Sequence, residues 1–406
     1  MPGRSTKLAL LIACSVALAG AVQPAPGAGQ PQGPAAPATP EDALFAQGQF
    51  TEAAEAYAQV LARDPGSAGA LAGLARVRLY EGREDEAVEL ARKALAIAPG
   101  HPVATGVLAI AAERARLFGP DLYQIEAPNG ASAIDFVITD PLPVIRVRIS
   151  GREAHFLLDT GAPNIMMKRE LAEELGLPIA EGGEGVFAGG QRARVERTTV
   201  PELELGGIRI RNVPAGINAA GGGIRLPNVE IDGIMGTGVL MHFLTTIDYC
   251  SGKLILAPRE DSAAFQARLA AAGANVLPMW LVGDHFVFAR ARMNKAPEAQ
   301  FFIDTGLAGG GLMANRAALD AAGVVLDETN VRTGVGGGGT VQVIPFRADA
   351  TLGTLTRLNV AGSHTPGGDP SSIFPFRTGG LLSHGFFRQS RLTFDFEAMR
   401  LATEDC

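Results

Sequence analysis

One six-residue pattern occurs twice in this chain, and each copy lies within a longer matching stretch. Residues 156–161 read FLLDTG and residues 301–306 read FFIDTG. Asp304 follows Asp159 by 145 residues, and from Gly176 onward the matching positions differ by 147. An offset that holds over about seventy residues indicates a duplicated fold. Whatever one copy folds into, the other must fold into as well.

The matching segments have the character of β-strands joined by glycine turns. They are LGGIRIRNV (205–213) with LGTLTRLNV (352–360), GIMGTG (233–238) with GLLSHG (380–385), and TIDY (246–249) with TFDF (393–396). Polar and apolar residues alternate in PVIRVRISGREAHFLLD, which is typical of strands. Asp248 and Asp395 fall at matching strand ends, and we predict structural roles for both.

Each copy carries a carboxylate to the end of a strongly apolar strand, where an isolated charge is costly. Two copies in one chain predict a pseudo-two-fold axis, and equivalent residues near such an axis come close together. Asp159 and Asp304 would then share one proton, so that one acts as base while the other acts as acid. Thr160 and Thr305 would lock the two turns, and the glycines that follow would allow their close approach.

The paired DTG turns resemble aspartic peptidases of the pepsin and retropepsin type, over roughly residues 142–403. The resemblance implies an endopeptidase that acts on an extended peptide or protein substrate and requires no cofactor and no metal. Glycine-rich hairpins at 186–191 and 335–340 would be flaps over the peptide. The implied site comprises catalytic Asp159 and Asp304, supporting Thr160, Gly161, Thr305 and Gly306, and flap residues Phe187, Gly189, Gly190, Gly336 and Gly337.

The chain already holds both aspartates, so we expect one protomer to form one site and the protein to be a monomer. The second copy differs from the first in having Leu307 after DTG and Ser383 in place of Gly236. A serine there could crowd the packing behind Asp304. The alternative function is a catalytically inactive peptidase-like protein that binds peptides or acts as a scaffold and is recruited through its helical repeats. Ala162 and Leu307 also replace the hydroxyl residue usual in pepsins, which predicts a milder pH optimum than that of gastric-type enzymes.

A different repeat precedes the β-rich region. Gly48 recurs as Gly82, and three further positions recur at the same spacing of 34: Ala53 as Ala87, Leu61 as Leu95, and Pro65 as Pro99. This period, with glycine at the turn and alanine at the helix contact, resembles tetratricopeptide repeats. The first repeat has a shortened leading helix, and a closing helix is expected from Pro102 to about Phe118. Such arrays bind protein partners or dock against a neighbouring domain, and the sequence leaves both roles open.

The predicted fold class is therefore multidomain, with a small all-α helical-repeat (TPR-like) domain before a mostly-β bilobal aspartic-protease (retropepsin-like) domain. The predicted boundaries are a signal peptide at 1–21, a Pro/Ala/Gly-rich linker at 22–40, TPR-like repeats at 41–118, lobe 1 at 119–274 and lobe 2 at 275–406.

The first residues resemble an export signal, because a basic start precedes an apolar run that is too short to span a bilayer. We expect a periplasmic or secreted protein without a transmembrane span after signal removal, with a lipid anchor through Cys14 as the second possibility. In an oxidising compartment Cys250 and Cys406 could pair, although no sequence feature brings them together. The net charge of −7 and the absence of Lys/Arg runs argue against a nucleic-acid partner.

Overall fold

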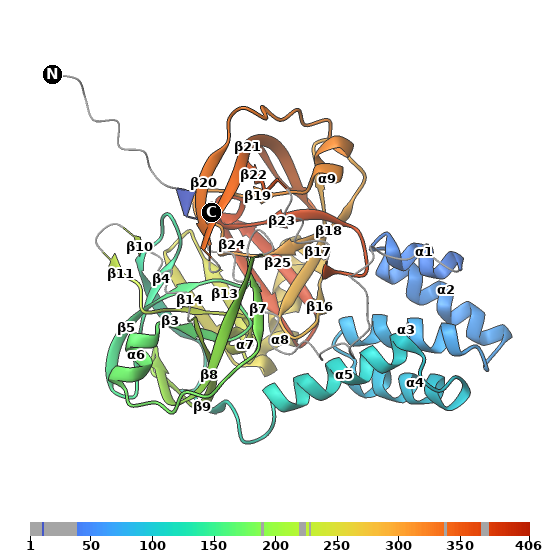
Figure 1. The fold of residues 1–406 in the computed structure, drawn as a ribbon, viewed down its shortest axis with the longest axis horizontal. Coiled ribbons are helices and arrows are strands. Elements are labelled where there is room, and N and C mark those ends of the chain that lie inside the picture. Colours follow the sequence, from blue (N-terminus) through green and yellow to red (C-terminus); the bar gives the residue numbers. More distant parts are fainter. Residues whose placement is uncertain are drawn as a thin grey trace.

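The computed structural model describes residues 10–11, 39–187, 191–218, 225–226, 229–336, 339–366 and 373–406. A helical array leads into a larger body of strands (Figure 1). The predicted signal peptide and linker lie outside the described residues, apart from a two-residue strand β1 (Leu10–Leu11) and residues 39 and 40. Strand β1 pairs in parallel with strand β20 (Arg332–Gly336). In the part of the chain that the structure describes, no helix has the length and apolar character needed to cross a membrane.

The helical array has the repeat that the sequence predicts. Its helices are α1 (Pro40–Ala46), α2 (Phe50–Arg63), α3 (Ala68–Tyr80), α4 (Glu84–Ile97) and α5 (Pro102–Leu117). Gly48 lies in the turn between α1 and α2, and Gly82 lies in the turn between α3 and α4. Both adopt positive φ, at 77° and 72° respectively. Glycine adopts this conformation readily, which explains its recurrence at the turns. The seven-residue α1 beside the thirteen-residue α3 confirms the shortened first helix.

The array ends where a linker enters lobe 1. The strands of this lobe are β2 (Gln124–Glu126), β3 (Ser132–Ile138), β4 (Val144–Ile149), β5 (Arg152–Leu158), β6 (Ile165–Met167), β7 (Glu184–Phe187), β8 (Gln191–Leu205), β9 (Ile208–Asn218), β10 (Arg225–Leu226), β11 (Val229–Glu230), β12 (Gly233–Met235), β13 (Leu244–Asp248) and β14 (Lys253–Ala257). Its helices are α6 (Arg169–Glu174), α7 (Thr237–Leu240), a 3₁₀ turn (Arg259–Asp261) and α8 (Ser262–Ala272).

Lobe 2 repeats this arrangement. Its strands are β15 (Asn275–Pro278), β16 (Trp280–Val282), β17 (Phe286–Met293), β18 (Ala299–Ile303), β19 (Leu312–Met313), β20, β21 (Gly339–Leu352), β22 (Leu355–His364), β23 (Thr378–Leu382), β24 (Ser390–Asp395) and β25 (Arg400–Asp405), with helices α9 (Arg316–Ala321) and α10 (His384–Phe387). Strand β5 pairs in parallel with β12, and β18 pairs in parallel with β23. Strands β6 with β9 and β19 with β22 form the next matching parallel pairs. The two copies therefore share both sequence and strand pairing.

The two lobes meet in a shared sheet. Strand β13 of lobe 1 pairs antiparallel with its counterpart β24 of lobe 2, and Thr246 lies opposite Thr393. These threonines are 147 residues apart, and their hydroxyl oxygens are 2.7 Å apart in a hydrogen bond. Equivalent residues that face each other place a pseudo-two-fold axis between the lobes. This axis is what brings the two DTG turns together.

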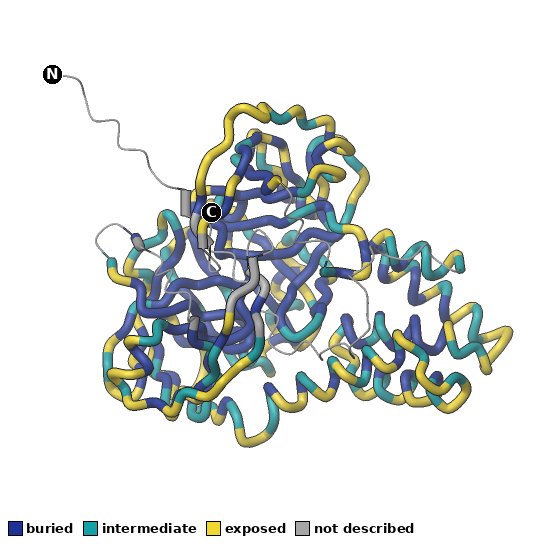
Figure 2. The backbone as a smooth tube through the Cα atoms, viewed as in Figure 1, coloured by how far each residue is buried: buried dark blue, intermediate teal, exposed yellow. Residues whose placement is uncertain are grey.

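The helical array and lobe 2 share one apolar core. Phe50 of α2 packs against Trp280 of β16 and against Phe376, at ring-centroid distances of 5.5 and 4.9 Å. Polar contacts reinforce the packing, because the buried Arg114 of α5 donates to the backbone oxygens of Leu281 (2.8 Å) and Gly283 (2.7 Å). Figure 2 shows buried segments throughout the β body and exposed residues along the outer turns of the array. The array is thus docked on lobe 2.

Candidate active site

The first DTG turn begins where strand β5 leaves its sheet. Strand β12 runs beside β5, and the carbonyl oxygen of Met235 accepts a hydrogen bond from the Asp159 backbone nitrogen at 3.1 Å. The side chain of Asp159 then turns back, and its Oδ1 accepts from the Gly161 nitrogen at 2.8 Å. Asp159 is fully buried. The apolar strand and its parallel neighbour therefore fix a carboxylate inside the protein.

The second turn repeats each of these contacts. The Asp304 nitrogen donates to the carbonyl oxygen of Leu382 at 3.0 Å, and Leu382 is the counterpart of Met235 in strand β23. Asp304 Oδ1 accepts from the Gly306 nitrogen at 2.8 Å, and this aspartate is also fully buried. The same sequence pattern thus produces the same local geometry twice.

Thr160 and Thr305 hold the two turns against each other. The backbone nitrogen of each threonine donates to the hydroxyl oxygen of the other, at 3.1 Å in both directions. Each hydroxyl donates onward across the lobe boundary, from Thr160 to the Ile303 carbonyl at 2.8 Å and from Thr305 to the Leu158 carbonyl at 3.3 Å. The four bonds are buried and symmetric. They fix the separation and orientation of the two aspartates.

The glycines after the threonines leave room for the opposite carboxyl group. A Cβ atom on Gly161 would lie 2.6 Å from both Cγ and Oδ2 of Asp304. A side chain at position 161 would therefore collide with the aspartate of the other lobe. The structure brings Asp159, Asp304 and their four supporting residues into one buried cluster, as the duplicated sequence predicts.

A further residue of the cluster was not predicted from the sequence. Thr237, in the first turn of helix α7, is fully buried, and its hydroxyl donates to the Thr160 carbonyl at 2.9 Å. It follows the Gly-Ile-Met-Gly element, so a hydroxyl residue at the end of that element was the available signal. Its counterpart in lobe 2 is His384, which instead contacts Asp140 of lobe 1 through Nε2 at 2.9 Å. The two lobes thus support their turns differently.

Ser383 does not crowd the second turn. Its buried hydroxyl oxygen accepts a hydrogen bond from the Leu307 nitrogen at 3.0 Å. In lobe 1 the same space is filled, because a Cβ on Gly236 would lie 2.2 Å from the carbonyl oxygen of Ala162. The two-residue insertion after the second DTG changes the path of the loop, and the serine fills the space this creates. The expected steric conflict is therefore wrong.

The two hairpins that the sequence predicts to be flaps are present, in part, among the described residues. Strand β7 pairs with β8, where Phe187 lies opposite Gln191, and strand β20 pairs with β21, where Gly336 lies opposite Gly339. The other predicted flap residues, Gly189, Gly190 and Gly337, lie outside the described residues.

Two other predictions are resolved by the contacts. Asp248 Oδ1 accepts from the nitrogens of Cys250 and Ser251, and Asp395 Oδ1 accepts from those of Glu397 and Ala398. These matching turns confirm structural roles for both aspartates. Cys250 and Cys406 form a disulfide with Cα atoms 5.3 Å apart, which links the end of β13 to the end of β25.

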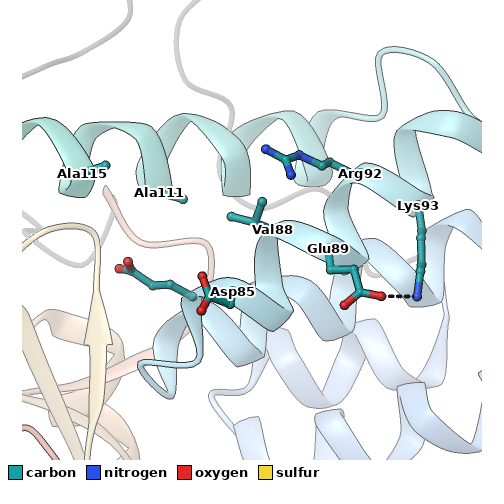
Figure 3. A pocket seen from close by; sticks show the side chains of 8 residues that line it. Asp85, Val88, Glu89, Arg92, Lys93, Ala111 and Ala115 are labelled. Carbon is teal, nitrogen blue, oxygen red and sulfur yellow. Dashed lines mark hydrogen bonds and ion pairs between the residues drawn. The ribbon is translucent and has the colours of Figure 1, made fainter.

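A separate pocket lies in the helical array (Figure 3). It has a volume of about 510 Å³ and lies between helices α4 and α5. Its lining includes Glu84, Val88 and Arg92, as well as Glu89 and Lys93, which pair with each other at 2.6 Å. No DTG residue contributes to this pocket. Within the described ranges, no group of three or more His, Cys, Asp or Glu side chains is arranged to hold a metal ion.

Two segments of the chain match models of known protein families. Residues 145–239 match the family model for aspartyl proteases. This match includes the first DTG turn and strand β12. The aspartyl-protease resemblance of lobe 2 rests on the internal repeat and on the matching contacts. Residues 44–109 match the family model for the tetratricopeptide repeat. Both resemblances drawn from the sequence are therefore confirmed.

The comparison with solved structures also gave matches. A retropepsin-like aspartic protease from Rickettsia conorii is 19% identical, with 34% of this chain and 94% of that chain covered and a TM-score of 0.23. The aspartic proteinase from Irpex lacteus is 11% identical, with 68% of this chain and 97% of that chain covered and a TM-score of 0.41. The comparison with curated proteins gave no match.

Proposed function

We propose that this protein is an aspartic-type endopeptidase that hydrolyses peptide bonds with a water activated between Asp159 and Asp304. The supporting observation is that two fully buried carboxyl groups lie on turns joined by reciprocal threonine bonds. Two neighbouring carboxylates cannot both carry charge at low cost in such a place, so they share one proton. The pair then contains an acid and a base at the same time.

The proposed chemistry follows from this shared proton. The charged carboxylate takes a proton from water as the water oxygen attacks the peptide carbonyl carbon. The protonated carboxyl group gives its proton to the carbonyl oxygen, which produces a neutral tetrahedral intermediate. When that intermediate collapses, a proton passes to the leaving nitrogen and the C–N bond breaks. No covalent bond to the enzyme is formed, and no cofactor takes part.

The hairpins β7–β8 and β20–β21 are suited to an extended peptide. A peptide strand can add its backbone to a hairpin edge and gain hydrogen bonds without regard to its sequence. Strand β20 already has a two-residue strand, β1, along its edge. We therefore expect a substrate that is unfolded or extended around the cleaved bond. A single chain supplies both aspartates, so a monomer suffices.

The decisive experiment compares wild type with Asp159→Asn and Asp304→Asn on a mixed peptide library, with and without pepstatin. We expect wild-type cleavage to be blocked by pepstatin and to be absent in both variants. Asp248→Asn is the matched control, because Asp248 is another buried strand-end aspartate that accepts backbone hydrogen bonds. It should keep its activity as long as it folds. Peptide binding by wild type without cleavage would instead favour the alternative of an inactive peptide-binding protein.

The role of the helical array belongs to this proposal. Helices α2 and α5 contact lobe 2 through Phe50 and Arg114. These contacts support docking of the array on lobe 2. A protein partner would have to use another surface, such as the α4–α5 side that holds the pocket in Figure 3. We therefore propose that the array primarily stabilises lobe 2 and that any partner binds the exposed side.

The proposed location is outside the cytoplasm, in the periplasm or the medium. The apolar N-terminal run motivates this proposal, with lipid anchoring through Cys14 as the variant. The Cys250–Cys406 disulfide supports it, because such bonds persist in oxidising compartments. Fractionation of cells that express the full chain, followed by N-terminal sequencing, tests the location and the cleavage site together.

A further inference from the structure

Tyr123 lies between the helical array and the first DTG turn. It belongs to the linker that connects helix α5 to strand β2, and it is buried. Its hydroxyl donates a hydrogen bond to Oδ1 of Asn164 at 2.6 Å, and both partners are buried. Burial raises the pKa of Tyr123 above its ordinary value, so the phenol remains protonated and able to donate. The linker thus makes a direct polar contact with lobe 1.

Asn164 belongs to the loop that follows the catalytic turn. Its backbone oxygen accepts from the Gly236 nitrogen at 2.9 Å. Its side-chain oxygen packs so closely on Gly238 that a Cβ there would lie 1.9 Å away. The amide of Asn164 is therefore fixed between Tyr123 and the start of helix α7. Helix α7 also contains Thr237, whose hydroxyl holds the Thr160 carbonyl.

Several contacts fix Tyr123 itself. Its ring packs on His242 at a centroid distance of 4.3 Å and stacks on Phe118, the last residue of the array, at 5.8 Å. Its backbone nitrogen donates to the Asn212 carbonyl at 3.3 Å. The backbone adopts a φ of 49°, which is strained for a bulky residue. Such strain persists only where surrounding contacts determine the conformation, and it tends to occur at functional sites.

Among the described residues of lobe 2, this contact has no equivalent. The counterpart of Asn164 is Gly311, and a Cβ at that position would lie 2.5 Å from Val360 and 2.6 Å from the Phe386 nitrogen. The second loop is instead held by Ser383, whose hydroxyl accepts from Leu307. The chain therefore supports its two catalytic loops by different means. The support in lobe 1 comes from a residue outside the duplicated region.

We propose that Tyr123 is a positioning residue for the Asp159 turn, acting through Asn164 and helix α7, an inference that rests on the proposed peptidase function. The helical array packs against lobe 2 and its linker reaches the catalytic loop of lobe 1, so it contributes to both halves of the site. Tyr123 does not touch the reacting atoms. Its effect is to keep the Asp159 turn at a fixed place relative to Asp304.

The test uses the full chain with Tyr123→Phe, which removes the hydroxyl and keeps the ring on His242. The matched control is Tyr57→Phe, because the Tyr57 hydroxyl also makes a 2.6 Å hydrogen bond, to Asp42, but lies within the array. For one cleaved peptide, we expect kcat to fall about tenfold in Tyr123→Phe with KM within about twofold. Tyr57→Phe should keep both constants.

A second readout does not depend on catalysis. The amide hydrogens of Gly236 and Gly238 donate to the loop at Asn164 and Pro163, so loosening the loop should speed their exchange with solvent. We expect faster exchange in Tyr123→Phe and no change in Tyr57→Phe. The kcat effects of Tyr123→Phe and Asn164→Ala should also be less than additive, since both remove the same contact.

The outcomes separate the two claims. Unchanged exchange at Gly236 and Gly238 in Tyr123→Phe would overturn the positioning role, whether or not the enzyme is active. Faster exchange with wild-type kcat would also overturn it, because the contact would then serve stability alone. Absence of cleavage by wild type would reject the peptidase function, and the exchange measurement would still decide whether Tyr123 holds the loop.

Discussion

Gly161 of lobe 1 lies directly against the carboxyl group of Asp304 in lobe 2. A Cβ atom at position 161 would lie 2.6 Å from Cγ of that aspartate, well inside the contact distance of two carbon atoms. The two DTG turns can approach only because this residue has no side chain. This contact between the lobes is the close approach that the duplicated sequence predicts for the glycines after the threonines.

Gly161→Ala should therefore separate the two turns. We expect the free energy of unfolding to fall by about 1–3 kcal/mol, as in other overpacked cores, and peptide cleavage to fall roughly a hundredfold because the carboxyl groups are displaced. Gly69→Ala is the control, since Gly69 is in helix α3 and, beyond its chain neighbours and its own helix backbone, no described residue has an atom within 4 Å of the added Cβ. It should raise stability by about 0.5–1 kcal/mol. Wild-type cleavage by Gly161→Ala would contradict the close approach.

Exchanging the residues at the matching positions Gly236 and Ser383 should destabilise the protein at both positions, but to different extents. Gly236→Ser places a Cβ 2.2 Å from the Ala162 carbonyl oxygen, so a severe loss of folded protein is expected. Ser383→Gly removes the acceptor of the buried Leu307 nitrogen and should cost about 1–3 kcal/mol. Ser383→Ala keeps the Cβ atom but removes the hydroxyl, so it measures the loss of the hydrogen bond without the loss of packing. Thermal unfolding of the three variants checks the order, and equal effects of both exchanges would show that the lobes are packed alike.

Docking of the array on lobe 2 predicts that replacing two arginines of helix α5, Arg114 and Arg116, has different effects on stability. Arg114→Met leaves the buried carbonyl of Leu281 and the partly buried carbonyl of Gly283 without this donor and should lower stability by about 2–4 kcal/mol. Arg116→Met removes only an exposed pair with Glu113 and should cost less than about 0.5 kcal/mol. Calorimetry should show one shared transition for the array and lobe 2 in wild type. A separate early transition of the array would indicate an independent module.

The disulfide predicts a dependence on redox conditions. Cys250 and Cys406 are 156 residues apart in sequence, so their bond closes a long loop in the unfolded chain. Its loss in Cys250→Ser should lower stability by about 2–5 kcal/mol. The double variant Cys250→Ser/Cys406→Ser should match the single one, and a reductant should have the same effect on wild type alone. A thermal transition that a reductant leaves unmoved would exclude a stabilising bond.

The sequence predicts the part of this structure that follows from internal repetition. The offsets of 145 and 147 identify the paired turns, because equivalent residues must occupy equivalent places. The contacts that distinguish the lobes have no such signal. The sequence suggested that Ser383 crowds the second turn. The path of the loop that contains the insertion after Asp304, which decides this, cannot be derived from the sequence. Thr237 was within a matched segment, but its partner His384 has different chemistry.

Other features depend on contacts between segments far apart in the chain. The cysteines pair because β13 and β25 lie in one shared sheet, and no local pattern reports this. The role of Tyr123 depends on a linker whose path is set by docking of the array. The repeat period predicted the helices themselves but not the surface on which they dock. That surface on lobe 2 contains apolar residues such as Trp280 and Phe376, which in the sequence look like residues of an ordinary β core.

The half-buried His242 and the buried His384 predict that the protein loses stability in acid. Burial lowers the pKa of His242 from its ordinary value of 6.5 to about 4, with a further lowering by Arg259. Burial also lowers the pKa of His384, against the opposing effect of Asp140. Above pH 6.5 His242 is neutral in both the folded and the unfolded chain, so it does not make the free energy of unfolding depend on pH. As the pH falls from 6.5 to about 4, the unfolded chain binds more protons, so the free energy of unfolding decreases.

For His242 the full decrease is at most roughly 3 kcal/mol, and it is complete below the folded pKa. His242→Phe keeps a ring against Tyr123 and Phe118 but cannot be protonated, so its stability should change less between pH 6.5 and 4 than that of wild type. Urea unfolding across this range measures the slope. A peptidase with these histidines should work best under mild acidity, in agreement with Ala162 and Leu307 after the DTG turns. An activity maximum at about pH 2 together with equal slopes for wild type and His242→Phe would refute this account.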